Sequence, residues 1–319
     1  MATDADRCYH RNNEATRIPA LHNAFEPMRR YISPLRYPGG KARIAPFAAQ
    51  LLAVQRPRAR RYAEPFAGGA GSALTLLVGE HVDLIHINDL DPGIAAFWRC
   101  VFNQTKRFVR LVEDAELSID AWHSAREIYL SPKRHSDLDL GFATFFLNRC
   151  NRSGILSARP IGGLEQTGQW GIDARFNRSE LAERISFVGS FRRRVQLTEL
   201  DARDFLDLLT PHRRELVAYV DPPYLGQGDK LYLDKLSEAD HRDLAEKLRR
   251  SPLNWFLTYD SDDRVTDELY VNLRCAEFDI KHTAQVNHVG TEFVVFADNL
   301  FVPDDLQVLA TARGRWVVA

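Results

Sequence analysis

A short apolar run, LVAYV at 216–220, ends at two prolines, and this boundary constrains the fold more than any other stretch. The length of the run suits a buried strand bounded by a turn. Pro222 and Pro223 lack a backbone N–H and have a fixed φ, so they cannot continue a central strand, and Asp221 before them is driven toward extended geometry. The sequence therefore predicts a stiff turn, carrying Asp221 and Tyr224, at the carboxyl end of a strand, where open α/β sheets bind ligands.

Strand patterns alternate with helix patterns on both sides of this turn. Upstream, a strand at Arg61 leads into EPFAGGAGS and a helix, and VDLIHIN leads to Asp89 and a helix that Pro92 opens. The alternation resumes at VQLTEL, with a short helix expected from Asp204. The last part, 270–279 and 292–297, has two strand patterns with no helix between them. This order predicts an α/β fold with a mostly parallel sheet and an antiparallel hairpin at one end.

The alternation stops between about 104 and 194. Helical patterns at 122–130 and 138–147 there precede a stretch rich in glycine and arginine. We therefore predict an inserted, mainly helical region at 104–194 within a domain formed by 31–103 and 195–319. Residues 1–30 are polar and without clear period, which predicts a flexible tail.

Composition excludes several classes of protein. The chain has 319 residues, 45% of them hydrophobic, which is ample for a core, and its four cysteines form no CxxC pair. A reduced, cytoplasmic compartment without structural zinc is expected. No apolar run approaches the ~18 residues that a membrane span needs. The net charge of −1 does not decide whether the partner is a nucleic acid, but clusters such as the three arginines at 192–194 could contact phosphate.

The stretch EPFAGGAGS indicates a ligand-binding turn, because glycines between a strand and a helix let the backbone approach a ligand. Its spacing fits neither GxGxxG nor GxxxxGK[ST], and tight packing is the alternative explanation. Asp89 lies about 20 residues further on, where an acidic side chain can bind the hydroxyls of a ribose. Together these features predict a cofactor that contains a nucleoside.

Four stretches in order, LRYPGGK, EPFAGGAGS, INDLDP and DPPY, resemble the motifs of the Dam-like, DPPY-type (alpha group) adenine-specific DNA methyltransferases. The resemblance covers most of 33–100 and 195–297. It implies a Rossmann-like, seven-stranded, mostly parallel sheet with one antiparallel hairpin strand. It also implies S-adenosylmethionine as cofactor and a target-recognition region inserted before the DPPY strand.

The same resemblance assigns cofactor binding to two glycine-containing loops and the strand ends beside them: Tyr37, Gly39, Gly40, Lys41, Glu64, Phe66, Gly68, Gly69, Asp89, Asp204 and Phe205. Asp89 would bind the ribose, and Asp204 with Phe205 would meet the adenine ring of the cofactor. The catalytic turn would be Asp221, Pro222, Pro223 and Tyr224. There the Asp221 carboxylate and the Pro222 carbonyl would accept the hydrogens of the target amino group, and Tyr224 would stack on the flipped base. No metal is needed.

The inserted region holds FFLNRCNRSGIL, which resembles the family's FFLNR segment that leads into the part facing DNA. Its donors suit base edges or phosphates, and we predict DNA contacts there from Asn148, Arg149, Asn151 and Arg152. A second hypothesis is that Arg192, Arg193 and Arg194 help to hold the duplex. A capped helix end followed by a solvated loop is the alternative for any one of these residues.

The sequence and the resemblance together predict a cytoplasmic enzyme that methylates the exocyclic amino group of adenine in double-stranded DNA. The resemblance also implies a monomer, although the residues do not fix the oligomeric state. Whether it is paired with a cognate restriction endonuclease, stands alone or is carried by a phage stays open. Two alternatives stay open: the same chemistry on the amino group of cytosine or on RNA, and a non-catalytic nucleic-acid-binding protein with a methyltransferase fold. The DNA sequence recognised is not fixed by these motifs.

Overall fold

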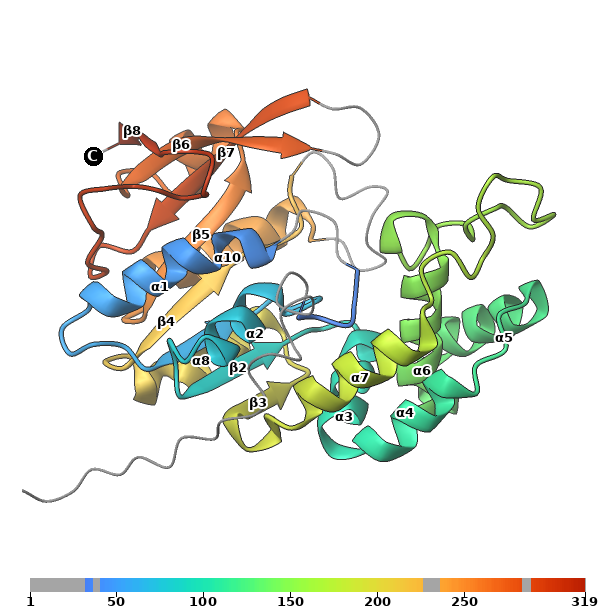
Figure 1. Ribbon diagram of the computed structural model, residues 1–319. Coiled ribbons are helices and arrows are strands. Elements are labelled where there is room, and N and C mark those ends of the chain that lie inside the picture. Colours follow the sequence, from blue (N-terminus) through green and yellow to red (C-terminus); the bar gives the residue numbers. More distant parts are fainter. Residues whose placement is uncertain (1–31, 37–40, 226–235, 283–287, 319) are drawn as a thin grey trace, which may run out of the picture. The chain divides into compact units, whose positions relative to one another are not determined.

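The computed structural model describes residues 32–36, 41–225, 236–282 and 288–318. The elements below all belong to one compact unit, Tyr31–Ala319. An eight-stranded mixed sheet organises this unit, in the order β3-β2-β1-β4-β5-β7-β6-β8 (Figure 1). The strands are β1 (Arg61–Glu64), β2 (Leu84–Asn88), β3 (Val195–Thr198), β4 (Leu216–Val220), β5 (Asn254–Asp260), β6 (Cys275–His282), β7 (His288–Phe296) and β8 (Arg315–Val318).

The middle of the sheet is parallel. Strand β1 pairs with β2 on one side and with β4 on the other, β2 pairs with β3, and β4 pairs with β5. All five residues of β4 are buried, which accounts for the unbroken apolar run LVAYV. The predicted α/β class and the predicted strand at this position are confirmed.

Helices cover both faces of this sheet. Those next to it include α1 (Ala45–Val54), α2 (Gly71–Val78), α8 (Ala202–Leu209) and α10 (Glu238–Arg250), and a short 3₁₀ helix, η2 (Lys41–Ile44), precedes α1. The connection from β1 through α2 to β2 moves toward the β3 edge of the sheet. The connection from β3 through α8 to β4 moves the other way, toward the β8 edge. Because parallel crossovers are right-handed, α2 and α8 cover opposite faces. Helix α1 packs with α2 (Figure 1), and α8 packs with α10.

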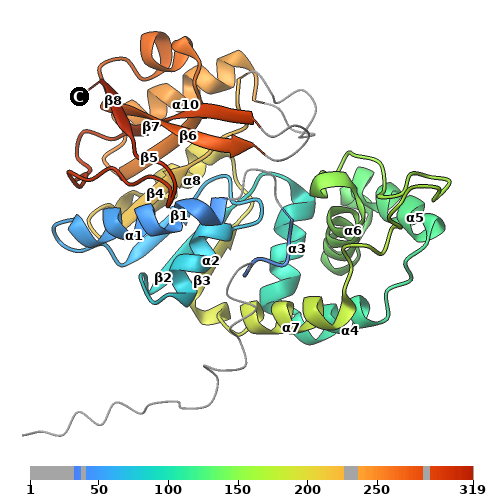
Figure 2. The same cartoon turned by 45° about the horizontal axis from the view of Figure 1, so that its top comes forward.

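Between β2 and β3 the chain forms five α-helices, which Figure 2 shows gathered together: α3 (Pro92–Asn103), α4 (Thr105–Glu113), α5 (Ile119–Leu130), α6 (Asp137–Cys150) and α7 (Arg178–Gly189). Helix α6 packs against α3 and α5, and α4 packs against α7. Aromatic rings fill the space between them: Phe97 stacks on Phe145 with centroids 5.7 Å apart, and Phe108 meets both rings edge-on. The helical character of this region agrees with the sequence pattern.

The helices begin where the sequence places capping residues. Asp91 accepts hydrogen bonds from the backbone of Gly93 and Ile94, with Pro92 in the first turn of α3. At the start of α10, Ser237 and Asp240 form a reciprocal capping box. Local signals of this kind explain why the expected helix starts match the structure within a few residues.

The expectation of seven strands with one antiparallel strand is wrong in one respect. An eighth strand, β8, pairs antiparallel with the outer edge of β6, so both β7 and β8 run against the parallel strands. Arg315 fixes β8 there through ion pairs with Glu277 and Asp279 of β6, at 3.1 and 3.0 Å. The hairpin boundaries also differ: β6 begins at Cys275 rather than near 270, because Asn272 has φ 63° and turns the chain before the strand.

Among the residues that the structure describes, no helix combines the length and apolarity needed to cross a membrane.

Candidate active site

The strand order reverses between β1 and β4, which lie side by side with Arg61 opposite Leu216 and Ala63 opposite Ala218. From β1 the chain moves to β2 on one side, and from β4 it moves to β5 on the other. The loops that follow the two strands therefore diverge at the carboxyl edge, and sheets of this kind bind ligands in the crevice between two such loops. One of these loops carries the glycine-rich turn, and the other carries Asp221 to Tyr224.

The glycine-rich turn after β1 has an unusual backbone. Gly68 has φ 47°, and Ala70, which bears a Cβ, is held at the same value. The Gly68 N–H donates to Asp89 Oδ2 at 2.7 Å, and the Gly68 carbonyl accepts from Trp98 Nε1 at 2.8 Å. A left-handed alanine costs free energy and persists where its surroundings determine it, as they do at many ligand sites.

Glu64 ends β1 and is buried. Its Oε1 accepts a 2.9 Å hydrogen bond from the backbone of Ala73 in the first turn of α2. The N-cap residue of that helix, Ala70, supplies no side-chain cap, so the Glu64 carboxylate stands in for one and faces the positive end of the helix dipole. Of the other residues predicted on this turn, Phe66 is half-buried against the core, and Gly69 is buried.

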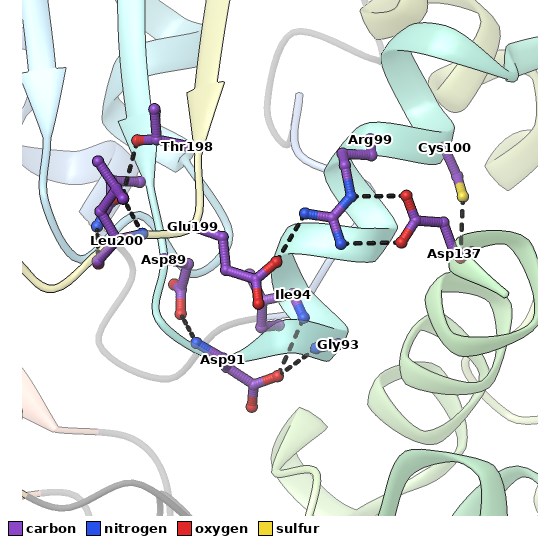
Figure 3. Close-up of polar contacts among 11 residues, drawn as sticks. Asp89, Asp91, Gly93, Ile94, Arg99, Cys100, Asp137, Thr198, Glu199 and Leu200 are labelled. Atoms are coloured by element: carbon purple, nitrogen blue, oxygen red, sulfur yellow. Dashed lines mark hydrogen bonds and ion pairs between the residues drawn. The ribbon is translucent and has the colours of Figure 1, made fainter. Parts of the chain in front are cut away.

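Asp89 follows β2 and is half-buried. Besides the Gly68 N–H, its carboxylate accepts the backbone N–H of Asp91 at 3.1 Å, as Figure 3 shows. The carboxylate is thus fixed at the end of the strand next to the glycine-rich turn. This is the position that the sequence predicted for a ribose-binding acid.

Asn88, the last residue of β2, was missed by the sequence reasoning. Its buried amide donates to the carbonyls of Pro65 and Leu200 at 3.0 and 2.9 Å, and its oxygen accepts from Thr198 Oγ1 at 2.7 Å and from the Leu200 N–H at 3.0 Å. One side chain therefore joins the end of β2 to the segments that follow β1 and β3. The available signal was a polar residue that closes an otherwise buried strand.

The DPPY turn continues directly from β4. Asp221 is buried, and its Oδ1 accepts a 3.2 Å hydrogen bond from Thr258 Oγ1 on β5. The Tyr224 ring is half-buried and stacks on Tyr259, with centroids 5.8 Å apart and 26° between the planes. Desolvation and then the negative charge of Asp221 raise the pKa of Tyr224 well above its usual value, so its hydroxyl stays protonated. Pro222 is buried, and Pro223 is half-buried.

The two residues predicted to meet the cofactor's adenine ring lie in the first turns of α8. Asp204 is exposed, whereas Phe205 is buried in the core. Helix α8 begins two residues before Asp204, because Asp201 caps it by accepting from the Arg203 N–H at 2.8 Å. Tyr37, Gly39 and Gly40 lie outside the described residues, as does the side chain of Lys41.

A comparison with family models now identifies the chain. The model of the D12 class N6 adenine-specific DNA methyltransferases matches residues 37–289, which include both loops of the crevice. The chain belongs to this family. The family resemblance seen in the four sequence motifs is confirmed, and so are methyltransferase activity and DNA methylation as the activity of the family.

Other comparisons add little to this assignment. No curated protein matches the chain. Among solved structures, the crystal structure of protein LPL1258 from Legionella pneumophila aligns with 85% of this chain and 90% of its own, at 10% identity and a TM-score of 0.35. No conclusion about fold or function follows from a similarity at this level.

In this D12 methyltransferase, two of the predicted DNA-contacting residues support the protein's own backbone. Asn148 is buried; its oxygen accepts from the Arg36 N–H at 2.7 Å, and its nitrogen donates to the carbonyls of Arg36 and Gly154, both at 2.8 Å. Asn151 is also buried. Its side-chain oxygen accepts a hydrogen bond from Trp122 Nε1, and its side-chain nitrogen donates to the carbonyls of Ile155 and Leu156. Both side-chain amides are therefore used in hydrogen bonds that hold the protein's own structure together.

The two arginines beside them differ in exposure. Arg149 donates to the carbonyl of Arg175 at 2.8 Å through Nε, and burial followed by the charges of Arg36 and Arg184 lowers its pKa to about 9. Arg152 is exposed in the turn after α6. Of the four predicted residues in this segment, Arg152 is therefore the one best placed to meet a ligand from solvent.

The arginines at 192–194 lie at the opposite edge of the sheet from the crevice, because they precede β3 and the site follows the carboxyl ends of the strands. Arg194 forms a pair of hydrogen bonds with Glu80, at 2.8 and 3.1 Å, and Arg192 donates to Asn103 Oδ1 at 3.1 Å. Arg193 is exposed. Arg194 thus pins β3 to the turn before β2, and the predicted role in holding the duplex is not supported by this placement.

No group of three or more histidine, cysteine, aspartate or glutamate side chains that could hold a metal ion is found in the described part of the chain.

Proposed function

We propose that this protein transfers the methyl group of S-adenosylmethionine to the exocyclic amino group of an adenine that is rotated out of duplex DNA. One observation carries the proposal: the strained glycine-rich turn after β1 and the buried Asp221 after β4 follow adjacent parallel strands at the point where the strand order reverses. A cofactor held at the first turn and a base held at the second would meet in one crevice.

The residues at the first turn fit a donor that contains a nucleoside. The Gly68 backbone lets a ligand approach closely, and the half-buried Asp89 carboxylate is fixed where a ribose hydroxyl pair can donate to it. Glu64, Phe66, Gly69, Asp204 and Phe205 are proposed to complete this side of the site, together with Tyr37, Gly39, Gly40 and Lys41. When bound, S-adenosylmethionine would supply a methyl group on a positively charged sulfur.

The second turn would activate the acceptor. The amino group of adenine is a poor nucleophile because its lone pair is delocalised into the ring. Hydrogen bonds from this group to the Asp221 carboxylate and the Pro222 carbonyl would orient the lone pair and stabilise the positive charge that develops on nitrogen as the N–C bond forms and the bond from the methyl carbon to sulfur breaks. The surplus N–H proton would then be released to water. Pro222 and Pro223 stiffen the turn, so the two acceptors are set before the base arrives.

Tyr224 would receive the flipped base on the face of its ring. The Tyr224 ring stacks on the ring of Tyr259, which limits its orientation. The Tyr259 hydroxyl is in turn hydrogen-bonded to the Nδ1 atom of the buried His241. A braced ring loses little conformational entropy when a base stacks on it, which favours base capture. Arg152 is proposed to contribute to DNA binding from the helical region, with 104–194 as the target-recognition domain.

The experiment uses wild-type protein, Asp221→Ala and the exposed control Asp305→Ala with methyl-labelled cofactor. Each is incubated with duplex DNA, single-stranded DNA or RNA, and the labelled nucleoside is identified. We expect N6-methyladenine from duplex DNA with wild-type protein and with Asp305→Ala, and none with Asp221→Ala, while cofactor affinity measured by calorimetry falls much less.

Each other result has a definite meaning. Label on the amino group of cytosine or in RNA would mean that the reaction is the proposed one but that its substrate is cytosine or RNA. Cofactor binding without label in any nucleic acid would favour a binding protein that retains the fold. Equal activity of Asp221→Ala and wild type would refute the proposed role of the DPPY turn.

A further inference from the structure

We propose that Thr258 is a positioning residue for the reaction, which fixes the Asp221 carboxylate through its hydroxyl while Tyr219 fixes Thr258. This inference rests on the function proposed above, because it deepens the role of Asp221. Thr258 is 1% exposed on β5. The register of β4 and β5 places Val220 opposite Leu257, so one residue further along Asp221 comes beside Thr258.

The direction of the hydrogen bonds follows from counting protons. Thr258 Oγ1 lies 3.2 Å from Asp221 Oδ1 and 2.8 Å from the Tyr219 hydroxyl, and it is also hydrogen-bonded to the Tyr224 hydroxyl, which has a proton of its own to donate. A carboxylate only accepts, and a threonine hydroxyl has a single proton to donate. Thr258 therefore donates to Asp221, and Tyr219 must be the donor to Thr258. The three side chains form a chain of hydrogen bonds in which Tyr219 donates to Thr258 and Thr258 donates to Asp221. Each bond polarises the next hydroxyl and so strengthens the next bond.

Tyr219 is suited to begin this chain of hydrogen bonds. Its ring stacks on Phe256 with centroids 4.8 Å apart and 18° between the planes, so the hydroxyl has a fixed position. Desolvation, and then the nearby charge of Asp221, raise the pKa of Tyr219 well above its usual value. The hydroxyl thus keeps its proton and remains a donor. Both Tyr219 and Thr258 belong to strands, which place side chains more rigidly than loops do.

A held carboxylate matters because Asp221 is the first residue beyond the strand. Rotation about its side-chain bonds would move the oxygen that is to accept the hydrogen of the target amino group. Such an acceptor contributes most when it is already oriented for the transition state, and a misplacement of about 1 Å can cost a large part of the rate. The Thr258 hydroxyl limits that rotation without itself touching the base.

The test compares Thr258→Val, Thr258→Ser and Tyr219→Phe with wild type in single-turnover methyl transfer to duplex DNA. The matched control is Thr105→Val, which removes a hydroxyl that bonds the Val101 carbonyl at 2.6 Å in the helical region. We expect Thr258→Val to lower the rate about tenfold, the usual scale for a lost hydrogen bond to a charged group. Affinities for cofactor and DNA should stay unchanged, Thr258→Ser should recover most of the rate, and Tyr219→Phe should cause a smaller loss.

Two outcomes would overturn the inference: a wild-type rate for Thr258→Val, or an equal loss for Thr258→Ser, which would make the methyl group rather than the hydroxyl responsible. Thr258→Val leaves the buried Tyr219 hydroxyl without its acceptor, which could itself destabilise the fold. The double variant Thr258→Val with Tyr219→Phe removes that hydroxyl, so a rate that stays low in the double variant is not caused by misfolding. Absence of transfer by wild type would refute the proposed function instead. In that case a double-mutant cycle of Thr258→Val and Asp221→Ala in unfolding free energy decides, since additive effects exclude the contact.

Discussion

The hydroxyl of Tyr129 donates a 2.6 Å hydrogen bond to Asp91 Oδ2. The other oxygen of the same carboxylate caps α3 through Gly93 and Ile94, and the Asp91 N–H is held by Asp89. Asp91 thus ties helix α5 of the helical region to the turn that carries the proposed ribose-binding acid. Arg99 makes a second tie, since it bonds both Asp137 at the start of α6 and Glu199 after β3 (Figure 3).

Tyr129→Phe should lower the free energy of unfolding by about 1 to 2 kcal/mol, because it removes a donor to a partly buried carboxylate. Chemical denaturation measures the change. Tyr270→Phe is the matched control: the buried Tyr270 hydroxyl has no hydrogen-bond partner within the described residues, so its removal should leave stability unchanged or slightly raised. Equal destabilisation by the two variants would contradict the importance of the Asp91 contact.

Asp89→Ala should weaken binding of S-adenosylhomocysteine at least about tenfold, since it removes both the proposed acceptor for the ribose and the bond that fixes Gly68. Isothermal titration calorimetry gives the affinity. The control is Asp83→Ala, which removes an exposed ion pair with Arg60 just before β2, at the other end of that strand, and exposed pairs contribute little. Unaltered affinity of Asp89→Ala would exclude this residue from the cofactor site.

Gly141→Ala sets helix propensity against packing. Alanine is favoured over glycine in a helix by about 1 kcal/mol, which alone would stabilise α6. A Cβ at this position, however, would lie 2.9 Å from the Ala96 carbonyl oxygen and 3.0 Å from the Phe97 nitrogen of α3, and backbone atoms cannot move aside cheaply. Overpacking typically costs about 1 to 3 kcal/mol, so we expect net destabilisation in a urea titration. A stabilised variant would show that α3 and α6 can separate at no cost.

His86 should make the protein sensitive to acid. Burial, and then the charges of Arg61 and His212, lower its pKa to about 4. As the pH falls below 6.5, the unfolded chain takes up a proton at this histidine before the folded protein does, so stability decreases between pH 6.5 and 4. The loss attributable to His86 is on the order of 3 kcal/mol.

Thermal unfolding of wild type and His86→Gln across this pH range tests the assignment. The variant should show a shallower fall in melting temperature, whereas the exposed His123→Gln should follow wild type. Parallel curves for wild type and His86→Gln would assign the acid sensitivity to other groups.

Sequence alone determined the features that depend on local chemistry. Pro222 and Pro223 must end a central strand wherever they occur, Asp91 and Pro92 must favour a helix start, and an unbroken apolar run of strand length must be buried on both faces. These signals were sufficient for the α/β class, for the positions of the two loops at the crevice and, through the order of the motifs, for the family.

How residues far apart in the chain use their polar groups depends on the folding of the whole chain. Asn148 is hydrogen-bonded to Arg36, 112 residues away, and Arg194 is hydrogen-bonded to Glu80, 114 residues away. Side chains that the sequence pattern made candidates for DNA contact are therefore used within the protein. Thr258 and Asp221 are brought together by the pairing of β4 with β5, and four residues at 315–318 find a place only because β6 has an open edge. A hydrogen-bond donor has the same sequence signature whether its acceptor is water, DNA or a distant carbonyl, and the fold makes that choice.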